Sequence, residues 1–211
     1  MKKMLAVQIG VLLLIAGSLG GMFAFTDVYH EIQKNIVTVL CLSCIKLQPI
    51  TEREFIFNTT NNVPHPDFVL KNLTKGPVFI EYSEDVCAAC DTMHPVIEQL
   101  FNVHFEKQDM AVQTIQFHQS NITFIYINID HTTKEMRNTL PIYDKDKIGG
   151  LPMFAIITLG NDTGSIKPYY TTLYGTLNLP TNEQRISFLT DVVQESIDFY
   201  HQYEEGFYTE H

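Results

Sequence analysis

One stretch of the sequence, GPVFIEYSEDVCAACDTMHP, limits the fold more than any other part of the chain. Its beginning, residues 76–83, is mostly apolar and predicts a buried strand introduced by Gly-Pro. Residues 87–105 predict a helix with a proline inside it. Cys87 stands where this helix would begin, so unpaired backbone N–H groups and the helix dipole would stabilise its thiolate. Cys90 lies one turn later on the same side and can close a disulfide with Cys87.

Strands and helices alternate after residue 66, and two strands joined by a short turn follow. This order predicts an α/β sandwich with a mixed central sheet, because strands separated by helices pair in parallel and hairpin strands pair antiparallel. The remaining elements that the pattern predicts are helices at 67–73, 131–140 and 182–205 and strands at 122–130, 149–159 and 166–175.

The N-terminus carries an apolar segment, residues 4–25, that holds no charge and follows Lys2 and Lys3. As a helix at about 1.5 Å per residue it would measure about 33 Å, enough to cross a hydrocarbon core of about 30 Å. We expect a single-pass anchor in the cell membrane, with the N-terminus cytoplasmic and the rest extracytoplasmic. A cleaved signal peptide ending near residues 16–18 is the alternative, and it would also export the chain.

The expected organisation has five parts along the chain. It consists of a signal anchor at 1–25, a juxtamembrane helix at 26–48, a linker at 49–66, the α/β domain at 67–205 and a tail at 206–211. The juxtamembrane helix carries a second C-x-x-C pair, Cys41 and Cys44.

Charge and glycosylation sequons bear on partners and location. The formal net charge of −10 argues against nucleic acid or an anionic membrane surface as a partner, because phosphate contacts require clustered Lys and Arg. An excess of N-x-[ST] sequons favours an extracytoplasmic glycoprotein. These sequons start at Asn58, Asn72, Asn121 and Asn161.

The stretch around Cys87 and Cys90 resembles the active-site strand, turn and kinked helix of the thioredoxin family. Pro95 falls where that family places its helix-kinking proline. Glu81 matches the family's buried carboxylate, which assists proton transfer at the resolving cysteine, although its pattern also fits a surface strand residue. The motif INID at 127–130 is similar to the end of the central strand.

Landmarks later in the chain extend this resemblance over about residues 67–200. The segment IGGLP is similar to the one that carries the family's cis-proline, so the resemblance implies a cis Leu151–Pro152 bond. Leu151 would then expose its backbone for pairing with a substrate chain. Gly175 matches the glycine in the last strand. The implied fold is a thioredoxin-like three-layer sandwich, preceded here by the transmembrane and juxtamembrane helices.

The implied activity is thiol–disulfide exchange with protein disulfides or dithiols. Cys87 would attack, Cys90 would resolve the mixed disulfide, and Glu81 would move the proton. No cofactor or metal is required, because the dithiol itself carries two electrons. The sequence leaves the direction open, since the residue before Cys87 is Val86 rather than an aromatic and the dipeptide between the cysteines is Ala-Ala. A non-enzymatic binding module with structural disulfides and a metallochaperone are the alternatives.

The pair Cys41 and Cys44 has several interpretations. Apolar neighbours should raise the thiol pKa values, which favours a local disulfide or buried thiols. Another hypothesis is an accessory redox relay that exchanges electrons with Cys87 and Cys90 or with a membrane partner. The CLSC segment is similar to one in membrane-anchored thioredoxin-like proteins, which suggests an archaeal source. A zinc site shared by both pairs is disfavoured by the 42 residues between them.

Overall fold

The computed structural model describes residues 57–60, 62–107, 110–144 and 147–210. Residues 208–210 are described by their backbone alone. The expected anchor, the juxtamembrane helix with Cys41 and Cys44, and most of the expected linker lie outside these residues. Within the described ranges, no helix combines the length and the apolar character needed to cross a membrane.

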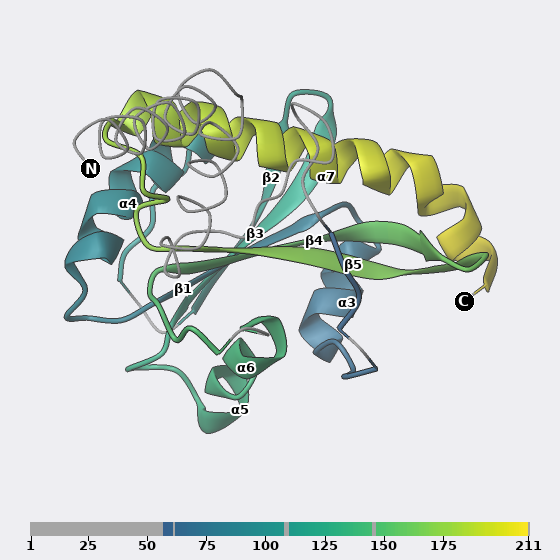
Figure 1. Cartoon of the computed structure of the whole chain (residues 1–211), viewed down its shortest axis with the longest axis horizontal. Helices are drawn as coiled ribbons and strands as arrows, with labels where there is room; N and C mark the ends of the chain where they lie inside the picture. The colour runs from purple at the N-terminus through teal and green to yellow at the C-terminus, as the bar shows by residue number, and fades with distance from the viewer. Residues whose placement is uncertain (1–56, 61, 108–109, 145–146, 211) are drawn as a thin grey trace, which may run out of the picture. The chain divides into compact units, whose positions relative to one another are not determined.

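A mixed sheet of five strands forms the centre of the described domain (Figure 1). Its order is β2-β3-β1-β4-β5, in which β1 runs parallel to β3 and antiparallel to β4. The hairpins β2–β3 and β4–β5 form the two edges. The strands are β1 (Val78–Ser83), β2 (Met110–Phe117), β3 (Ser120–Asn128), β4 (Met153–Asp162) and β5 (Ser165–Tyr174).

Helices cover both faces of this sheet and complete a three-layer sandwich (Figure 1). Helix α4 (Ala88–Phe101) and the first half of α7 (Asn182–Glu210) pack on one face. Helices α3 (Asp67–Leu73), α5 (Lys134–Arg137) and α6 (Leu140–Tyr143) lie on the other. Alternate residues of β1 point to the two apolar clusters, and all six are buried, as expected for a central strand.

Three elements differ from the sequence-based expectation. Strand β2 was not predicted, and it is an edge strand in which apolar and polar residues share the ladder with β3. The helix expected at 131–140 is two short helices, α5 and α6, separated by Asn138 and Thr139. Helix α7 continues to Glu210, so residues 206–210 are not a tail. Phe207 holds this end of the helix on the domain, because it is buried in the apolar cluster that includes Val69 of α3 and Tyr170 of β5.

The end of the expected linker also belongs to the domain. Phe57 is buried and contacts Phe199 edge to face at 5.5 Å between ring centroids. Asn58 exchanges two backbone hydrogen bonds of 2.9 Å with Tyr170 of β5. The linker prediction is therefore wrong from Phe57 onward, because its apolar and backbone groups find partners on the domain.

Candidate active site

The two cysteines form a disulfide at the start of α4. Cys87 is the N-cap residue in extended conformation, and its Sγ accepts a hydrogen bond of 3.0 Å from the backbone N–H of Cys90. The sulfurs are bonded at 1.97 Å with the Cα atoms 5.1 Å apart. Cys87 is 9% exposed and Cys90 only 2%. Cys87 is therefore the more accessible residue of the two, and its sulfur sits where helix N–H groups stabilise a thiolate.

Helix α4 holds this disulfide against the sheet. Met93, Val96 and Ile97 are fully buried on its inner face. Pro95 lies inside the helix, as expected, and cannot donate the backbone hydrogen bond of a normal residue at that position. The helix ends at Phe101 rather than at residue 105, because Asn102 adopts a left-handed conformation that terminates it.

Glu81 lies in the interior beneath α4. It is 1% exposed, and strand alternation places it on the same sheet face as Phe79, which packs in the cluster formed with α4 and α7. Its neighbours across the ladders are Tyr126 on β3 and Phe154 on β4. Burial raises the pKa of its carboxyl from 4.5 to about 8. The surface interpretation of Glu81 is therefore wrong, and at neutral pH most of this carboxyl holds its proton.

The predicted cis bond between Leu151 and Pro152 is confirmed. It directly precedes β4, whose first residue, Met153, pairs with Tyr82 near the end of β1. The loop to Cys87 leaves from that same end of β1. The register therefore brings the cis-proline segment and the C-x-x-C segment to the same end of the paired strands β1 and β4. The carbonyl of Pro152 accepts a hydrogen bond of 2.8 Å from Gly175.

A polar cluster that the sequence did not single out holds the loop before Cys87. The Oδ1 atom of Asp85 accepts a hydrogen bond of 2.9 Å from Asn128, and its Oδ2 lies 2.7 Å from Nε2 of His131. The backbone N–H of Asp85 donates to Asp130 at 2.9 Å. The Asn128 bond, and next the His131 bond, lower the pKa of Asp85. The cluster therefore ties the loop to the end of β3 and keeps a negative charge two residues from Cys87.

A second carboxylate, Asp144, holds the loop before the cis-proline. Its Oδ1 accepts from the backbone of Ile148 at 2.9 Å and from the hydroxyl of Tyr174 at 2.8 Å. Its Oδ2 accepts from the backbone of Gly149 at 2.9 Å. Sequence reasoning missed this residue too, because its partners are identified only by the folded loop. Each of the two loops at the site is thus held by one carboxylate: the loop before Cys87 by Asp85 at the surface, and the loop before the cis-proline by the buried Asp144.

A cation stands beside the beginning of α4. Lys107 forms an ion pair with Asp91, the residue after Cys90, and this bond raises the lysine pKa. The lysine comes from the segment between α4 and β2. Across the described ranges, no cluster of three or more His, Cys, Asp or Glu is arranged to hold a metal.

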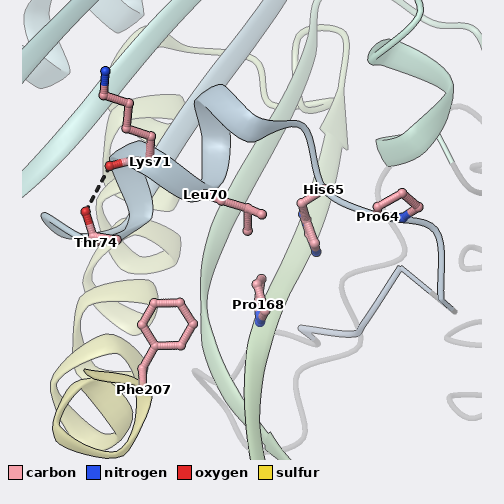
Figure 2. A pocket seen from close by; sticks show the side chains of 7 residues that line it. All are labelled: Pro64, His65, Leu70, Lys71, Thr74, Pro168 and Phe207. Atoms are coloured by element: carbon pink, nitrogen blue, oxygen red, sulfur yellow. Dashed lines mark hydrogen bonds between the residues drawn. The ribbon is translucent and has the colours of Figure 1, made fainter. Parts of the chain in front are cut away.

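A separate hollow of about 510 Å³ lies at the opposite end of the sheet. Pro168, one of its lining residues, pairs with Leu159 of β4. Leu159 lies two residues beyond Ile157, which pairs with Val78, the first residue of β1. Figure 2 shows side chains from α3, β5 and α7 facing it. The lining residues are Pro64, His65, Leu70, Lys71, Thr74, Pro168 and Phe207. No cysteine or carboxylate is among them, so this hollow is not part of the disulfide site.

Comparison with known proteins gave matches in structure alone. No protein-family model matches the sequence, and no curated protein sequence matches it. Among solved structures, oxidised mitochondrial thioredoxin 3 from Saccharomyces cerevisiae is 12% identical, with 65% of this chain and 99% of that chain covered and a TM-score of 0.34. A thioredoxin from Thermus thermophilus is 15% identical, with 62% and 87% covered and a TM-score of 0.32.

The described domain has the features that the resemblance in sequence implied. These are the mixed sheet, the C-x-x-C disulfide at the start of α4 and the cis Leu151–Pro152 bond. The disulfide and the cis bond lie at the same end of the paired strands β1 and β4, and Glu81 is buried on β1.

Proposed function

We propose that this chain is a thiol–disulfide oxidoreductase that exchanges disulfides with protein substrates. The observation that carries the proposal is the disulfide at the N-terminus of α4, in which Cys87 is more exposed than Cys90, together with a carboxyl of raised pKa buried on the sheet face that α4 covers. Strongly perturbed carboxyl groups next to a nucleophile are typical of functional sites. A disulfide that only staples the fold would not require a protonated glutamate in the core.

In the reducing direction, the thiolate of Cys87 attacks one sulfur of a substrate disulfide. A Cys87–substrate bond forms, the substrate disulfide breaks, and one substrate thiolate leaves and takes up a proton. Cys90 then transfers its proton to Glu81 and attacks Cys87. The Cys87–Cys90 bond forms and the second substrate sulfur leaves, so two electrons have passed to the substrate. The oxidising direction is the same sequence reversed.

Glu81 is suited to the proton step because its pKa of about 8 lies close to neutral pH. In the oxidised protein its carboxyl is mostly protonated and supplies a proton to Cys90 when the disulfide opens. As a carboxylate it removes that proton when the disulfide closes. No cofactor is needed for either direction.

The exposed side chain of Val86 and the cis-proline segment would hold the substrate. Val86 is 92% exposed directly before the nucleophile. Leu151, which is half-buried, and the buried Pro152 directly precede β4, and an extended substrate chain would pair with the backbone of Leu151. This arrangement favours flexible or unfolded protein segments over small thiols.

The chain's location is part of the proposal. The apolar segment at 4–25 would anchor the protein in the cell membrane and export the domain as a glycoprotein. Asn58, Asn121 and Asn161 are exposed, which suits glycosylation. In this setting, Cys41 and Cys44 would exchange electrons between the domain and a membrane partner.

The decisive experiment is a Cys90→Ser substitution in the full-length chain. The reduced variant is mixed with a disulfide-bonded peptide, and products are separated without reducing agent. We expect a stable mixed disulfide through Cys87, because the resolving thiol is missing. Cys87→Ser is the matched control and should trap none.

Other outcomes would point to other functions. Trapping by neither variant would favour a binding module, and stoichiometric bound metal on purification would favour a metallochaperone. The reduction potential of the Cys87–Cys90 pair decides the direction. A value near about −270 mV favours reduction of substrates, and one near about −120 mV favours oxidation.

A further inference from the structure

Four polar side chains form a ladder on the sheet face that α4 covers. Glu81 and Ser83 lie on β1, and their register partners on β3 are Tyr126 and Asn128. All four are at most 1% exposed. The residues around them on this face are aromatic: Phe79, Phe124 and Phe154. Four adjacent polar residues in such a core need a reason beyond packing, because burying polar groups costs free energy.

Two atoms in the ladder lack a normal partner. Among the described residues, Oε2 of Glu81 has no hydrogen-bond partner, and the hydroxyl of Tyr126 has none of normal geometry, although the Ser83 side chain is close enough to lower the pKa of that phenol. The two residues are direct neighbours across the β1–β3 ladder and point to the same face. Unpaired buried polar atoms are rare and often mark functional sites.

The outer end of the ladder reaches the surface. Asn128 donates to Asp85, which is 45% exposed and bonded to His131. The phenol of Tyr126 interacts electrostatically with Glu81 in the interior and with Lys107 and Asp85, whose side chains are partly exposed. Tyr126 is therefore within electrostatic range of both the buried carboxyl, its register partner, and the charged groups at the surface.

We propose that Tyr126 is a positioning residue whose hydroxyl carries the proton between Glu81 and the protein surface. The proposal rests on the proposed function, because it supplies the proton route for the step at Cys90. When the disulfide is reduced, an incoming thiolate bonds to Cys87, and the electron pair of the broken bond goes to Cys90. Glu81 gives its proton to Cys90, and the hydroxyl of Tyr126 donates to the carboxylate that forms.

The chemistry of the phenol suits this role. A hydroxyl can donate one hydrogen bond and accept another, so it passes one proton inward while taking one from the outer side. Burial, the largest cause, raises the pKa of Tyr126, so the phenol stays neutral while it relays. Without it, the new carboxylate of Glu81 would be left buried and unpaired, which is costly.

The test is reduction of the oxidised full-length chain by dithiothreitol in a single turnover. Wild type, Tyr126→Phe, Glu81→Gln and the double variant are quenched with acid at several times and their free thiols counted. The thiolate fraction of dithiothreitol is the same for every variant, so the ratio to wild type isolates the protein's own proton step. Tyr82→Phe is the matched control, because it removes a buried hydroxyl from the opposite face, where it bonds to Thr139 at 2.8 Å.

We expect Tyr126→Phe to react about 10-fold more slowly at pH 6–7, a part of the 10²–10⁴-fold that general acid catalysis contributes. The loss should shrink above about pH 9, where Glu81 no longer holds a proton in either protein. Adding Tyr126→Phe to Glu81→Gln should cause no further loss, because both act in one step.

A loss that is equal at all pH values, a similar loss in Tyr82→Phe, or an added loss in the double variant would overturn the proposal. So would wild-type rates in Tyr126→Phe. These outcomes are separate from failure of the proposed function, which the Cys90→Ser trap reports with a peptide substrate.

Discussion

The buried carboxyl of Glu81 should make the stability of the protein depend strongly on pH. Its pKa rises from 4.5 to about 8 on folding. Below pH 4.5 both states hold the proton, and stability is unaffected. Between these pKa values the unfolded chain ionises while the folded chain does not, so the folded state loses stability as pH rises, until the loss levels off above about pH 8. At about 1.4 kcal/mol per pKa unit, the loss is about 3 kcal/mol at pH 7 and about 5 kcal/mol at pH 9.

Glu81→Gln keeps the shape of the side chain and removes its ionisation. We expect the variant to exceed wild type in free energy of unfolding by about 1 kcal/mol at pH 5, about 3 at pH 7 and about 5 at pH 9. Urea unfolding of the oxidised full-length chain, followed by circular dichroism at the three pH values, measures this difference. At pH 7 it corresponds to a rise of about 6–12 °C in Tm.

Comparing the two proteins at each pH removes the effects of other groups. His65, for example, has its pKa lowered to about 4 by burial, which weakens the fold in acid but does so equally in both proteins. Glu135→Gln, an exposed glutamate on α5, controls for the change in net charge. A constant difference between Glu81→Gln and wild type from pH 5 to pH 9 would refute the reasoning.

Two further predictions concern the loops and the second cysteine pair. Asp144→Asn replaces one of two carboxylate oxygens, each of which accepts from a backbone N–H, with an NH2 donor. We expect a loss of about 1–3 kcal/mol and faster hydrogen exchange at Ile148 or Gly149, and unchanged exchange at both would contradict the assigned role. Replacing both Cys41 and Cys44 with Ser should leave the reaction of the reduced domain intact but slow its redox cycling in membranes; unchanged cycling would mean that the pair is structural.

The sequence predicted those parts of the site that depend on local pattern. An apolar run that leads into C-x-x-C and then a helical stretch defines strand, turn and helix within a few residues, and the structure has them. The cis-proline was also predicted, from the segment around Pro152. The strand β2 was missed, because exposed Val112 and polar residues such as Gln113 and Gln116 obscure a simple two-residue period.

The residues that hold the site together could not be predicted in the same way. Asp85 finds its partners more than forty positions away, at the end of β3, and Tyr126 meets Glu81 only through the parallel register of β1 and β3. Glu81 itself was ambiguous because β1 is buried on both faces, so alternation alone does not reveal which side chains are interior. Contacts of this kind depend on sheet order, which local pattern does not determine.

The stability cost of Glu81 separates a functional role from a structural one. If Glu81 served packing alone, glutamine or an apolar residue of similar size would fill the space without the loss of stability that the carboxyl causes at neutral pH. Removing it is expected to stabilise the protein and, if Glu81 moves the proton, to slow the opening and closing of the disulfide. Opposite changes in stability and rate in one variant are typical of an active-site residue. A gain in stability with no loss of rate would leave Glu81 without a role in exchange, and the proton route through Tyr126 would fail with it.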